Sequence, residues 1–283
     1  MCSCRRATGA RRSSISIRHA RTRLSLSLFR CNDKGIFREL AAAVDRGVDV
    51  EVLVTSRAKG GKKKLRKLWQ RLEETGATVS AYNDPVVKYH AKYAVADDGP
   101  ALVASLNLTK KCFAKTCDAV VLTYDPDVVS GLRQLTATDR DGIAPPPTLT
   151  PRLILGPETA RKQFTALIGG ARSSILMIDP KLSDPDLVAL LAQRRADGLT
   201  VHIHQDCHVG ALKSHGKIML IDGTLAVVGS LALTALSIDF RREVAITITE
   251  PTAVAEIQSL FSSLGLTTAQ PGAEPAPAGG ASC

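Results

Sequence analysis

Two short stretches decide how this chain is organised: Lys88-Tyr-His90-Ala-Lys92 and Lys213-Ser-His215-Gly-Lys217. They lie 125 residues apart, and the match continues without a gap for some thirty residues. The pairs matched at this offset include Asp97 and Asp222, Ser105 and Ser230, Leu106 and Leu231, Thr109 and Thr234, and Asp118 and Glu243. The sequence therefore predicts a duplicated unit in which each half carries one copy of the same motif.

Upstream of the motifs the halves match at a different offset, 151, which pairs Asp33 with Asp184 and Gly47 with Gly198. The first half therefore holds an insertion of 26 residues between about 53 and 87. Leucines and a tryptophan within it recur at helical spacing and predict an amphipathic helix. The basic residues that we expect to steer an anionic substrate there are Lys62, Lys63, Lys64, Arg66 and Lys67. The alternative is an ordinary solvated charged face.

Each half reads as strand, helix, strand and then the motif strands. This alternation predicts an α/β fold of two pseudo-symmetric domains in one chain, each a mixed β-sheet flanked by helices. In the first half we expect strands at 24–29, 48–54, 89–95 and 101–104 and a helix at 35–45. In the second half we expect strands at 174–178, 200–204, 217–221 and 225–228 and helices at 157–169 and 186–196.

A length of 283 residues also suggests two domains. We expect a basic arm at 1–20, a first domain at 21–140, a Pro-rich linker at 141–152, a second domain at 153–266 and a disordered tail at 267–283. The formal net charge of +10 favours an anionic partner, either nucleic acid or an anionic membrane surface. The uncharged, apolar stretch at 223–238 is too short to span a bilayer as a helix.

The seven cysteines are odd in number and scattered, so they do not form the framework of a disulfide-rich protein. Cys112 and Cys117 are close in sequence, but no second Cys or His pair completes a zinc site. We expect free thiols and a reducing, cytoplasmic setting. No apolar core of a secretory signal follows the arginines of the N-terminal segment.

Each motif has the pattern His-x-Lys, four residues, Asp. Residues i and i+2 face the same side of a strand, so His90 should project with Lys92, and His215 with Lys217. A duplicated chain can bring both pairs to one cleft across a pseudo-two-fold axis. Two imidazoles and two ammonium groups around one cleft suit a phosphodiester.

The residue types predict the chemistry. One unprotonated histidine attacks phosphorus to form a phosphohistidine, and the other, protonated, gives a proton to the leaving oxygen. The lysines hold the non-bridging oxygens. Asp118 and Glu243 are expected to accept a proton from the far ring nitrogen of a histidine and thereby select its tautomer. No metal or other cofactor is expected, because the lysines supply the positive charge.

This constellation resembles the phospholipase D superfamily, whose motif continues into Gly-Ser-x-Asn. The continuations here are Ala104-Ser105-Leu-Asn107 and Gly229-Ser230-Leu-Ala232. The resemblance covers roughly residues 20–265. It implies two phospholipase D-like domains, with His90 as the nucleophile in the better-preserved copy and His215 as the general acid.

The resemblance also implies roles for the surrounding motif residues. Asn107 would bind phosphate oxygens, and Ala232 departs from the pattern because it replaces the second asparagine. Asp97 and Asp222 would orient neighbouring backbone, with Ser105 and Ser230 in support.

The resemblance makes hydrolysis of a phospholipid, or transfer of its phosphatidyl group, the expected activity. A nuclease of the same superfamily, acting on DNA or RNA, uses the same motifs and stays open. So does a degenerate module that binds phosphate backbones without catalysis. A monomer suffices for all three, because both motifs lie in one chain, and peripheral contact with an anionic membrane is a further possible interaction.

Overall fold

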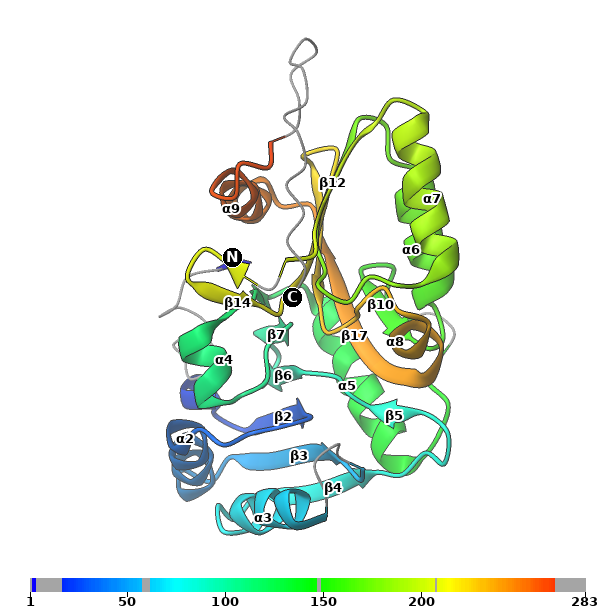
Figure 1. Ribbon diagram of the computed structural model, residues 1–283. Helices are drawn as coiled ribbons and strands as arrows, with labels where there is room; N and C mark the ends of the chain where they lie inside the picture. The colour runs from blue at the N-terminus through cyan, green and yellow to red at the C-terminus, as the bar shows by residue number, and fades with distance from the viewer. Residues whose placement is uncertain (1, 4–16, 58–61, 147–148, 207, 268–283) are drawn as a thin grey trace.

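Two mixed β-sheets form the body of the protein, one from each half of the sequence (Figure 1). The computed structural model describes residues 2–3, 17–57, 62–146, 149–206 and 208–267. Most of the expected arm at 1–20 and of the expected tail at 267–283 lies outside the described residues. The first sheet has the order β1-β9-β7-β6-β2-β3-β4. Its strands span Cys2–Ser3, Val120–Thr123, Ala101–Ala104, Tyr93–Ala96, Arg23–Leu28, Asp49–Thr55 and Thr78–Tyr82.

The second sheet has the order β10-β17-β16-β15-β11-β12, with β5 paired to β17 off this path. Its strands span Leu153–Gly156, Arg241–Ile248, Leu225–Gly229, Lys217–Ile221, Ser174–Ile178, Thr200–His204 and, for β5, Lys88–Tyr89. Corresponding strands pair alike in both sheets: β2 is parallel to β3 and antiparallel to β6, as β11 is to β12 and β15. The expected α/β fold with two mixed sheets is confirmed.

Helices cover the outer face of each sheet. In the first lobe (residues 17–146) these are α2, Lys34–Asp45, α3, Lys62–Glu73, and α4, Lys110–Lys115. In the second lobe (residues 149–267) they are α6, Ala160–Gly169, α7, Pro185–Ala196, and α8, Ala235–Phe240. Two more helices, α5 at Pro126–Asp141 and α9 at Pro251–Ser262, follow the last sheet strand of their lobes.

The local sequence explains how α2 begins and which face it buries. Asp33 is its N-cap, where the carboxylate accepts a hydrogen bond from the backbone N–H of Gly35 at 2.7 Å. Ile36, Leu40 and Ala43 recur along one face and are fully buried against the sheet. The helix is thus held by its buried face rather than by its length.

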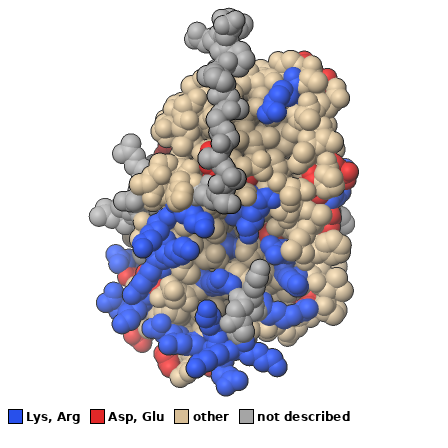
Figure 2. Space-filling view, in the orientation of Figure 1, with Lys and Arg blue, Asp and Glu red and all other residues tan. Residues whose placement is uncertain are grey.

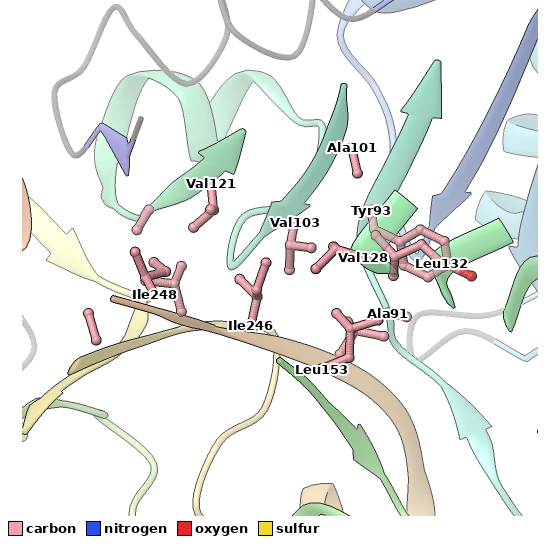
Figure 3. Close-up of a cluster of buried hydrophobic side chains, with 14 of the residues drawn as sticks. Ala91, Tyr93, Ala101, Val103, Val121, Val128, Leu132, Leu153, Ile246 and Ile248 are labelled. Atoms are coloured by element: carbon pink, nitrogen blue, oxygen red, sulfur yellow. The ribbon is translucent and has the colours of Figure 1, made fainter. Parts of the chain in front are cut away.

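A shared hydrophobic core joins the lobes, and its members come from both sheets, α5 and α9 (Figure 3). Val103 and Val121 of the first sheet belong to the same cluster as Ile246 and Ile248 of the second. Separate clusters lie between each sheet and its outer helices. The lobes are therefore packed face to face through apolar side chains, which fixes the motifs of the two halves relative to each other.

Short strands also pair across the lobe boundary. In the first lobe, β5 runs parallel to β17 of the second, with Arg242 opposite Tyr89. In the second lobe, β14 (Leu212–Ser214) runs parallel to β8 (Thr116–Cys117) of the first and antiparallel to β13 (His208–Val209). The two cross-lobe pairings are related by the same offset of 125 residues. The segment just before each motif is therefore a strand of the opposite lobe.

The first lobe begins earlier in the chain than expected, whereas its last helix ends where the linker was expected. Ile17 and Ala20, placed in the arm from the sequence, are buried in the core of the first lobe, and β1 pairs with β9. After α5, Gly142 adopts a left-handed conformation with φ of 68°, which ends the helix where the linker was expected. The difference at the N-terminal side arises because burial of single apolar residues is not visible in an Arg-rich segment.

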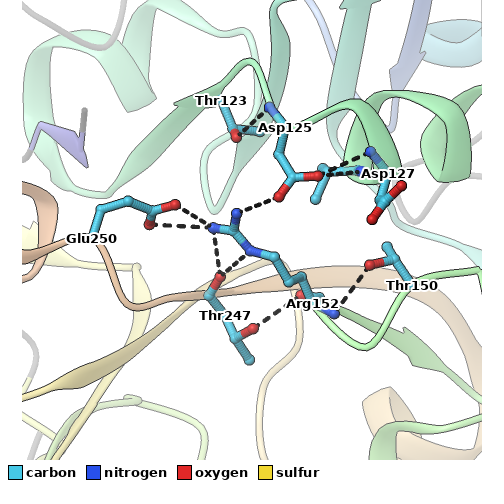
Figure 4. A network of polar contacts seen from close by, with 8 residues as sticks. Thr123, Asp125, Asp127, Thr150, Arg152, Thr247 and Glu250 are labelled. Carbon is cyan, nitrogen blue, oxygen red and sulfur yellow. Dashed lines mark hydrogen bonds and ion pairs between the residues drawn. The ribbon is translucent and has the colours of Figure 1, made fainter.

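Arg152, at the end of the expected linker, ties the two lobes together (Figure 4). Its guanidinium donates to Asp125 at 2.6 Å and pairs with Glu250 at 3.0 Å. Asp125 and Glu250 are the N-caps of α5 and α9, which correspond to each other in the duplication. One arginine thus connects the starts of two pseudo-equivalent helices.

Candidate active site

The motif histidines lie where the chain crosses from one lobe to the other. His90 follows β5, and its backbone N–H donates to the carbonyl of Arg242 at 2.9 Å. Gly216, just after His215, donates likewise to the carbonyl of Cys117 at 2.8 Å. The strand expected at 89–95 is wrong in this detail, because residues 90–92 form a break between β5 and β6. The break exists because β5 pairs with the second lobe and β6 with the first.

Each histidine is paired with the acid of the opposite half. His90 Nδ1 lies 2.8 Å from Glu243 Oε2, and His215 Nδ1 lies 2.8 Å from Asp118 Oδ1. Both carboxylates are buried, at 0% and 7% exposure. A carboxylate acceptor at Nδ1 places the proton there and leaves Nε2 as the second, reactive nitrogen. Neither half can therefore complete a histidine–acid pair by itself.

The electrostatic surroundings of His90 favour its neutral form. Burial lowers the pKa of this ring to about 4, the charges of Lys92 and Lys217 add to the decrease, and Glu243 opposes it. The ring is also held by Phe29, whose centroid lies 4.5 Å from that of His90 in an edge-on contact. An unprotonated imidazole near pH 7 is the form that can attack phosphorus.

Glu243 stays ionised although it is completely buried. Burial raises its pKa, but the interactions with His90 and Lys92 outweigh this and lower it to about 2. Its other oxygen accepts a hydrogen bond from the hydroxyl of Ser237 at 3.0 Å. Asp118 is held in the same way by Ser105 at 2.7 Å and by Thr116 at 2.6 Å. Both acids are thus fixed in position before any substrate binds.

The motif lysines lie inside the site, at 5% exposure for Lys92 and 8% for Lys217. Each Nζ donates to the carbonyl of the histidine two residues before it. The pKa of Lys92 is lowered to about 7. Burial is the main cause and the charge of Lys217 adds to the decrease, while Glu243 opposes it. The charge of Lys217 contributes to the lowered pKa of both Lys92 and His90. An anionic phosphate between the two ammonium groups would favour their charged forms.

The asparagine position distinguishes the two halves. Asn107 lines a pocket together with Lys92, and its Oδ1 is buried without a hydrogen-bond partner among the described residues. An unpartnered amide beside a lysine is suited to a polar ligand. Ala232 occupies the corresponding place in the second half, is 2% exposed and offers only a methyl group. Ser230 retains its partner there, because its hydroxyl accepts from the N–H of Val244 at 3.1 Å.

Asp97 and Asp222 lie outside the reacting groups and bind backbone instead. Asp97 accepts from the N–H groups of Arg21, Thr22 and Arg23 at 2.8–3.1 Å. Asp222 makes the same set of bonds to residues 172–174 at 2.8–3.1 Å. Both aspartates adopt positive φ, 42° and 52°, at the tight turn after the motif strand. Each one ties its turn to the start of the neighbouring central strand.

Cys112 lies beside the second acid–histidine pair. Its sulfur, a carboxylate oxygen of Asp118 and a ring nitrogen of His215 are all within 4.8 Å of one another. Such a set could hold a metal ion, but the Asp118–His215 hydrogen bond already uses two of the three groups. In the duplication Cys112 corresponds to Ser237, which contacts Glu243. The cysteine therefore occupies the position of an acid-supporting side chain. Cys31, Cys112 and Cys117 are free thiols.

Three side chains near the site were missed from the sequence: Phe29, Ser237 and Lys181. Burial lowers the pKa of Lys181, and the charges of Lys217 and Arg241 add to the decrease. The offset of 151 residues pairs Lys181 with Arg30, the residue after Phe29. The upstream alignment of the halves could therefore have indicated Lys181, whereas no pattern indicated Phe29 or Ser237.

The predicted steering residues divide into two sets on α3. Lys64 and Lys67 line a groove on the first lobe, whereas Lys62, Lys63 and Arg66 are exposed and do not line it. The predicted amphipathic helix itself is present, with Leu68 and Leu72 buried.

Comparison with known proteins identifies the family and the fold of the chain. A family described as "Cardiolipin synthase, PLD-like domain" matches residues 14–139 and 202–264. Polyphosphate kinase from Porphyromonas gingivalis has a similar fold, with a TM-score of 0.75 and 19% identity over 92% of this chain and 46% of that one. This chain thus spans about half of that kinase. Phosphatidylserine synthase from Haemophilus influenzae matches with a TM-score of 0.68 and 13% identity over 93% and 86% of the two chains. Among curated proteins, none matches the sequence.

The chain belongs to the phospholipase D-like superfamily, because the family match covers more than half of it. Among the described residues, no helix is long and apolar enough to cross a membrane.

Proposed function

We propose that this protein is a phosphodiesterase of the phospholipase D type that acts through a phosphohistidine on His90 and needs no metal ion. The observation that supports this most strongly is the crossed pairing of His90 with Glu243 and of His215 with Asp118. It gives both imidazoles the same tautomer and leaves both Nε2 atoms available for chemistry. Structural neighbours of such low identity support only the fold.

In the first step, Nε2 of neutral His90 attacks phosphorus, and the bond from phosphorus to the leaving oxygen breaks with its electron pair. Protonated His215 gives that oxygen its proton. In the second step, His215 takes a proton from water as the water oxygen attacks the same phosphorus. The phosphorus–nitrogen bond breaks, and His90 is regenerated neutral. Lys92 and Lys217 offset the charge on the non-bridging oxygens in both steps.

The asymmetry between the halves favours His90 over His215 as the nucleophile. His90 is the ring whose pKa is lowered to about 4. Its half also carries Asn107, while the second half has Ala232. A neutral ring and an additional phosphate donor both favour attack from the first half.

A single-turnover experiment tests this assignment. The protein is mixed with bis(p-nitrophenyl) phosphate in EDTA, quenched under denaturing alkaline conditions, because the phosphorus–nitrogen bond is labile in acid, and digested for mass spectrometry. We expect turnover in the chelator and a nitrophenyl phosphate adduct on the peptide that contains His90. An adduct on His215 would reverse the roles, and loss of turnover on chelation would contradict the metal-free mechanism.

The same histidine pair would act on a phospholipid or on a nucleic acid. The superfamily resemblance makes a phospholipid the default substrate, with hydrolysis or phosphatidyl transfer as the reaction, and nucleic acid the alternative. Comparing choline release from phosphatidylcholine vesicles with plasmid nicking separates these two. Binding of either substrate without turnover would instead support a non-catalytic phosphate-binding module.

A further inference from the structure

A basic groove of about 510 Å³ lies on the first lobe between α3, residues 29–32 and the segment that carries Thr109 and Lys111. Lys64, Lys67 and Arg71 of α3 line one side of it, and Lys111 lines another. Figure 2 shows Lys and Arg gathered over the part of the molecule that holds α3 and α4, while the opposite end is mostly uncharged. The sequence insertion that forms α3 is absent from the second half, so the groove belongs to one lobe only.

The groove adjoins the reacting groups through Phe29. This side chain lines the groove, and its ring also contacts His90 with centroids 4.5 Å apart. On the same ring, Lys92 Nζ lies 5.5 Å from the centroid. Phe29 thus forms the wall between the groove and the motif of the first lobe. A chain-like substrate held at His90 could continue over this wall into the groove.

The cations of the groove are available to a ligand. Within the described ranges, no carboxylate forms an ion pair with Lys64, Lys67 or Lys111. Arg71 stacks over Phe37 at 4.6 Å, which orients its guanidinium without neutralising it. Several uncompensated cations around one groove produce a strong local attraction for a polyanion.

The orientation of α3 argues against a membrane as the partner. A helix that binds a lipid surface must present its apolar face to the acyl chains. Here Leu68 is 8% exposed, Leu72 is fully buried, and Leu65 and Trp69 pack against the core of the first lobe. The apolar face of α3 is thus already used in folding. A phospholipid with one phosphate also cannot engage the motif lysines and the groove together with that single group.

We propose that this groove binds the phosphates next to the scissile one on a nucleic-acid strand, so that the substrate is a polynucleotide. This inference rests on the proposed phosphodiesterase activity and selects its substrate class. The strand crosses the site at His90 and continues along α3 on the first lobe. The sugar–phosphate backbone supplies the repeated charges that Lys64, Lys67, Arg71 and Lys111 can contact.

Two triple variants of α3 test the proposal with equal loss of charge. The groove variant is Lys64→Gln, Lys67→Gln and Arg71→Gln, and the control variant is Lys62→Gln, Lys63→Gln and Arg66→Gln. The measured quantity is the ratio of kcat/KM for a 20-nucleotide single strand to kcat/KM for bis(p-nitrophenyl) phosphate. We expect the groove variant to lower this ratio roughly 10- to 100-fold, and the control variant to change it less than about threefold.

Salt dependence gives a second measurement. A single strand contributes about −0.7 to the slope of log affinity against log salt for each phosphate neutralised. Binding of a labelled 20-mer is followed by fluorescence anisotropy at several salt concentrations. The slope should be smaller in magnitude by about 2 in the groove variant than in the wild type, and unchanged in the control variant. Melting temperatures verify that both variants fold.

The possible failures are distinguishable. The wild type could fail to turn over bis(p-nitrophenyl) phosphate while 20-mer binding is lost in the groove variant and kept in the control variant. This result would contradict the phosphodiesterase proposal and support nucleic-acid binding by the groove. Equal losses in both variants would show general electrostatic attraction and overturn the groove. A groove-dependent activity seen only on anionic phospholipid vesicles would overturn the nucleic-acid assignment.

Discussion

His90 and His215 have equivalent sequence motifs but different expected roles, and their acid partners allow the roles to be separated. Glu243 is hydrogen-bonded to His90, the nucleophile of the proposed mechanism, and Asp118 to His215, its proposed general acid. Every phosphodiester needs the nucleophile, but only some leaving groups need the general acid. A poor leaving group needs protonation, whereas p-nitrophenolate leaves without it.

We therefore expect Glu243→Gln and Asp118→Asn to differ in their sensitivity to the leaving group. Glu243→Gln should lower kcat about 10- to 100-fold for every phosphodiester, because the nucleophile loses its partner. Asp118→Asn should lower kcat by a similar factor for a diester with an alkyl leaving group, and by much less for one with a p-nitrophenol leaving group. Steady-state kinetics on matched methyl and p-nitrophenyl diesters makes the comparison, and equal sensitivity of both variants would contradict the crossed roles.

The pH dependence of kcat/KM should reflect His90 and Lys92. Burial, with the nearby lysines, lowers the pKa of His90 to about 4, so activity should fall only when the pH approaches that value and the nucleophile is protonated. Burial lowers the pKa of Lys92 to about 7, so activity should also decline above that pH as the ammonium loses its proton. A profile of kcat/KM from pH 3 to 10 tests this, with bis(p-nitrophenyl) phosphate as the substrate because its leaving group departs without protonation. An acidic limb at an ordinary histidine value of about 6.5 would contradict the neutral, buried nucleophile.

Restoring the missing amide should raise activity. Ala232→Asn puts a donor where the first half has Asn107, and one added hydrogen bond to a charged phosphate is worth about 1–3 kcal/mol. This corresponds to an increase in kcat/KM of roughly 5- to 160-fold, measured on a minimal diester. Because Ala232 is 2% exposed, thermal unfolding of the variant must be followed in parallel. A folded variant with unchanged kcat/KM would show that the second asparagine position does not contact the phosphate.

At the scale of elements, the turns at Asp97 and Asp222 hold the motif strands to the central strands. Partial burial raises the pKa of Asp97, but the backbone hydrogen bonds from Thr22, Arg23 and Arg21 outweigh it and lower the pKa to about 2. The folded value is below the unfolded one of about 3.9. The stabilisation is therefore fully present above about pH 5 and is lost as the pH falls towards 2.

The variant Asp97→Asn should remove this contribution. Asparagine tolerates the positive φ of the turn and keeps one acceptor, so the backbone is not strained. We expect a lower free energy of unfolding at pH 7, by about 1–2 kcal/mol, and a smaller loss of stability between pH 5 and pH 3. Urea denaturation at the three pH values measures both. An unchanged pH dependence would show that Asp97 does not titrate with folding.

At the scale of the whole molecule, the active site depends on how the two lobes are docked. The shared core supplies most of the contact, and Arg152 adds a polar link between the N-caps of α5 and α9. The guanidinium and the Asp125 carboxylate are about a quarter exposed, at 23% and 25%. Hydrogen bonds between charged groups at this level of burial stabilise more than fully exposed pairs.

We expect Arg152→Met to destabilise the fold by about 2 kcal/mol, because it leaves Asp125 without its partner. Methionine keeps the aliphatic part of the side chain, so the packing changes little. Thermal unfolding measures the effect, with Arg172→Met as an exposed control on the same lobe. A decrease no larger than that of the control would show that the lobes are held by the core alone.

The sequence by itself determined the duplication, the α/β class and the residues of both motifs. The reason is that His90, Lys92, His215 and Lys217 recur with their neighbours at a constant offset, and that apolar periodicity is a local property of the chain. It also located the inserted basic helix, because the two offsets differ by 26 residues.

Only the tertiary structure decided which acid serves which histidine, and that the chain leaves its strand at His90. Those features depend on β5 and β14 pairing with the opposite lobe, and no local pattern encodes a pairing between segments more than 95 residues apart. The same holds for Phe29 and for the division of the α3 lysines into those that line the groove and those that do not. Contacts of this kind arise when apolar surfaces that are distant in the sequence pack together. This packing sets the positions of the polar groups in space, which their order in the sequence does not reveal.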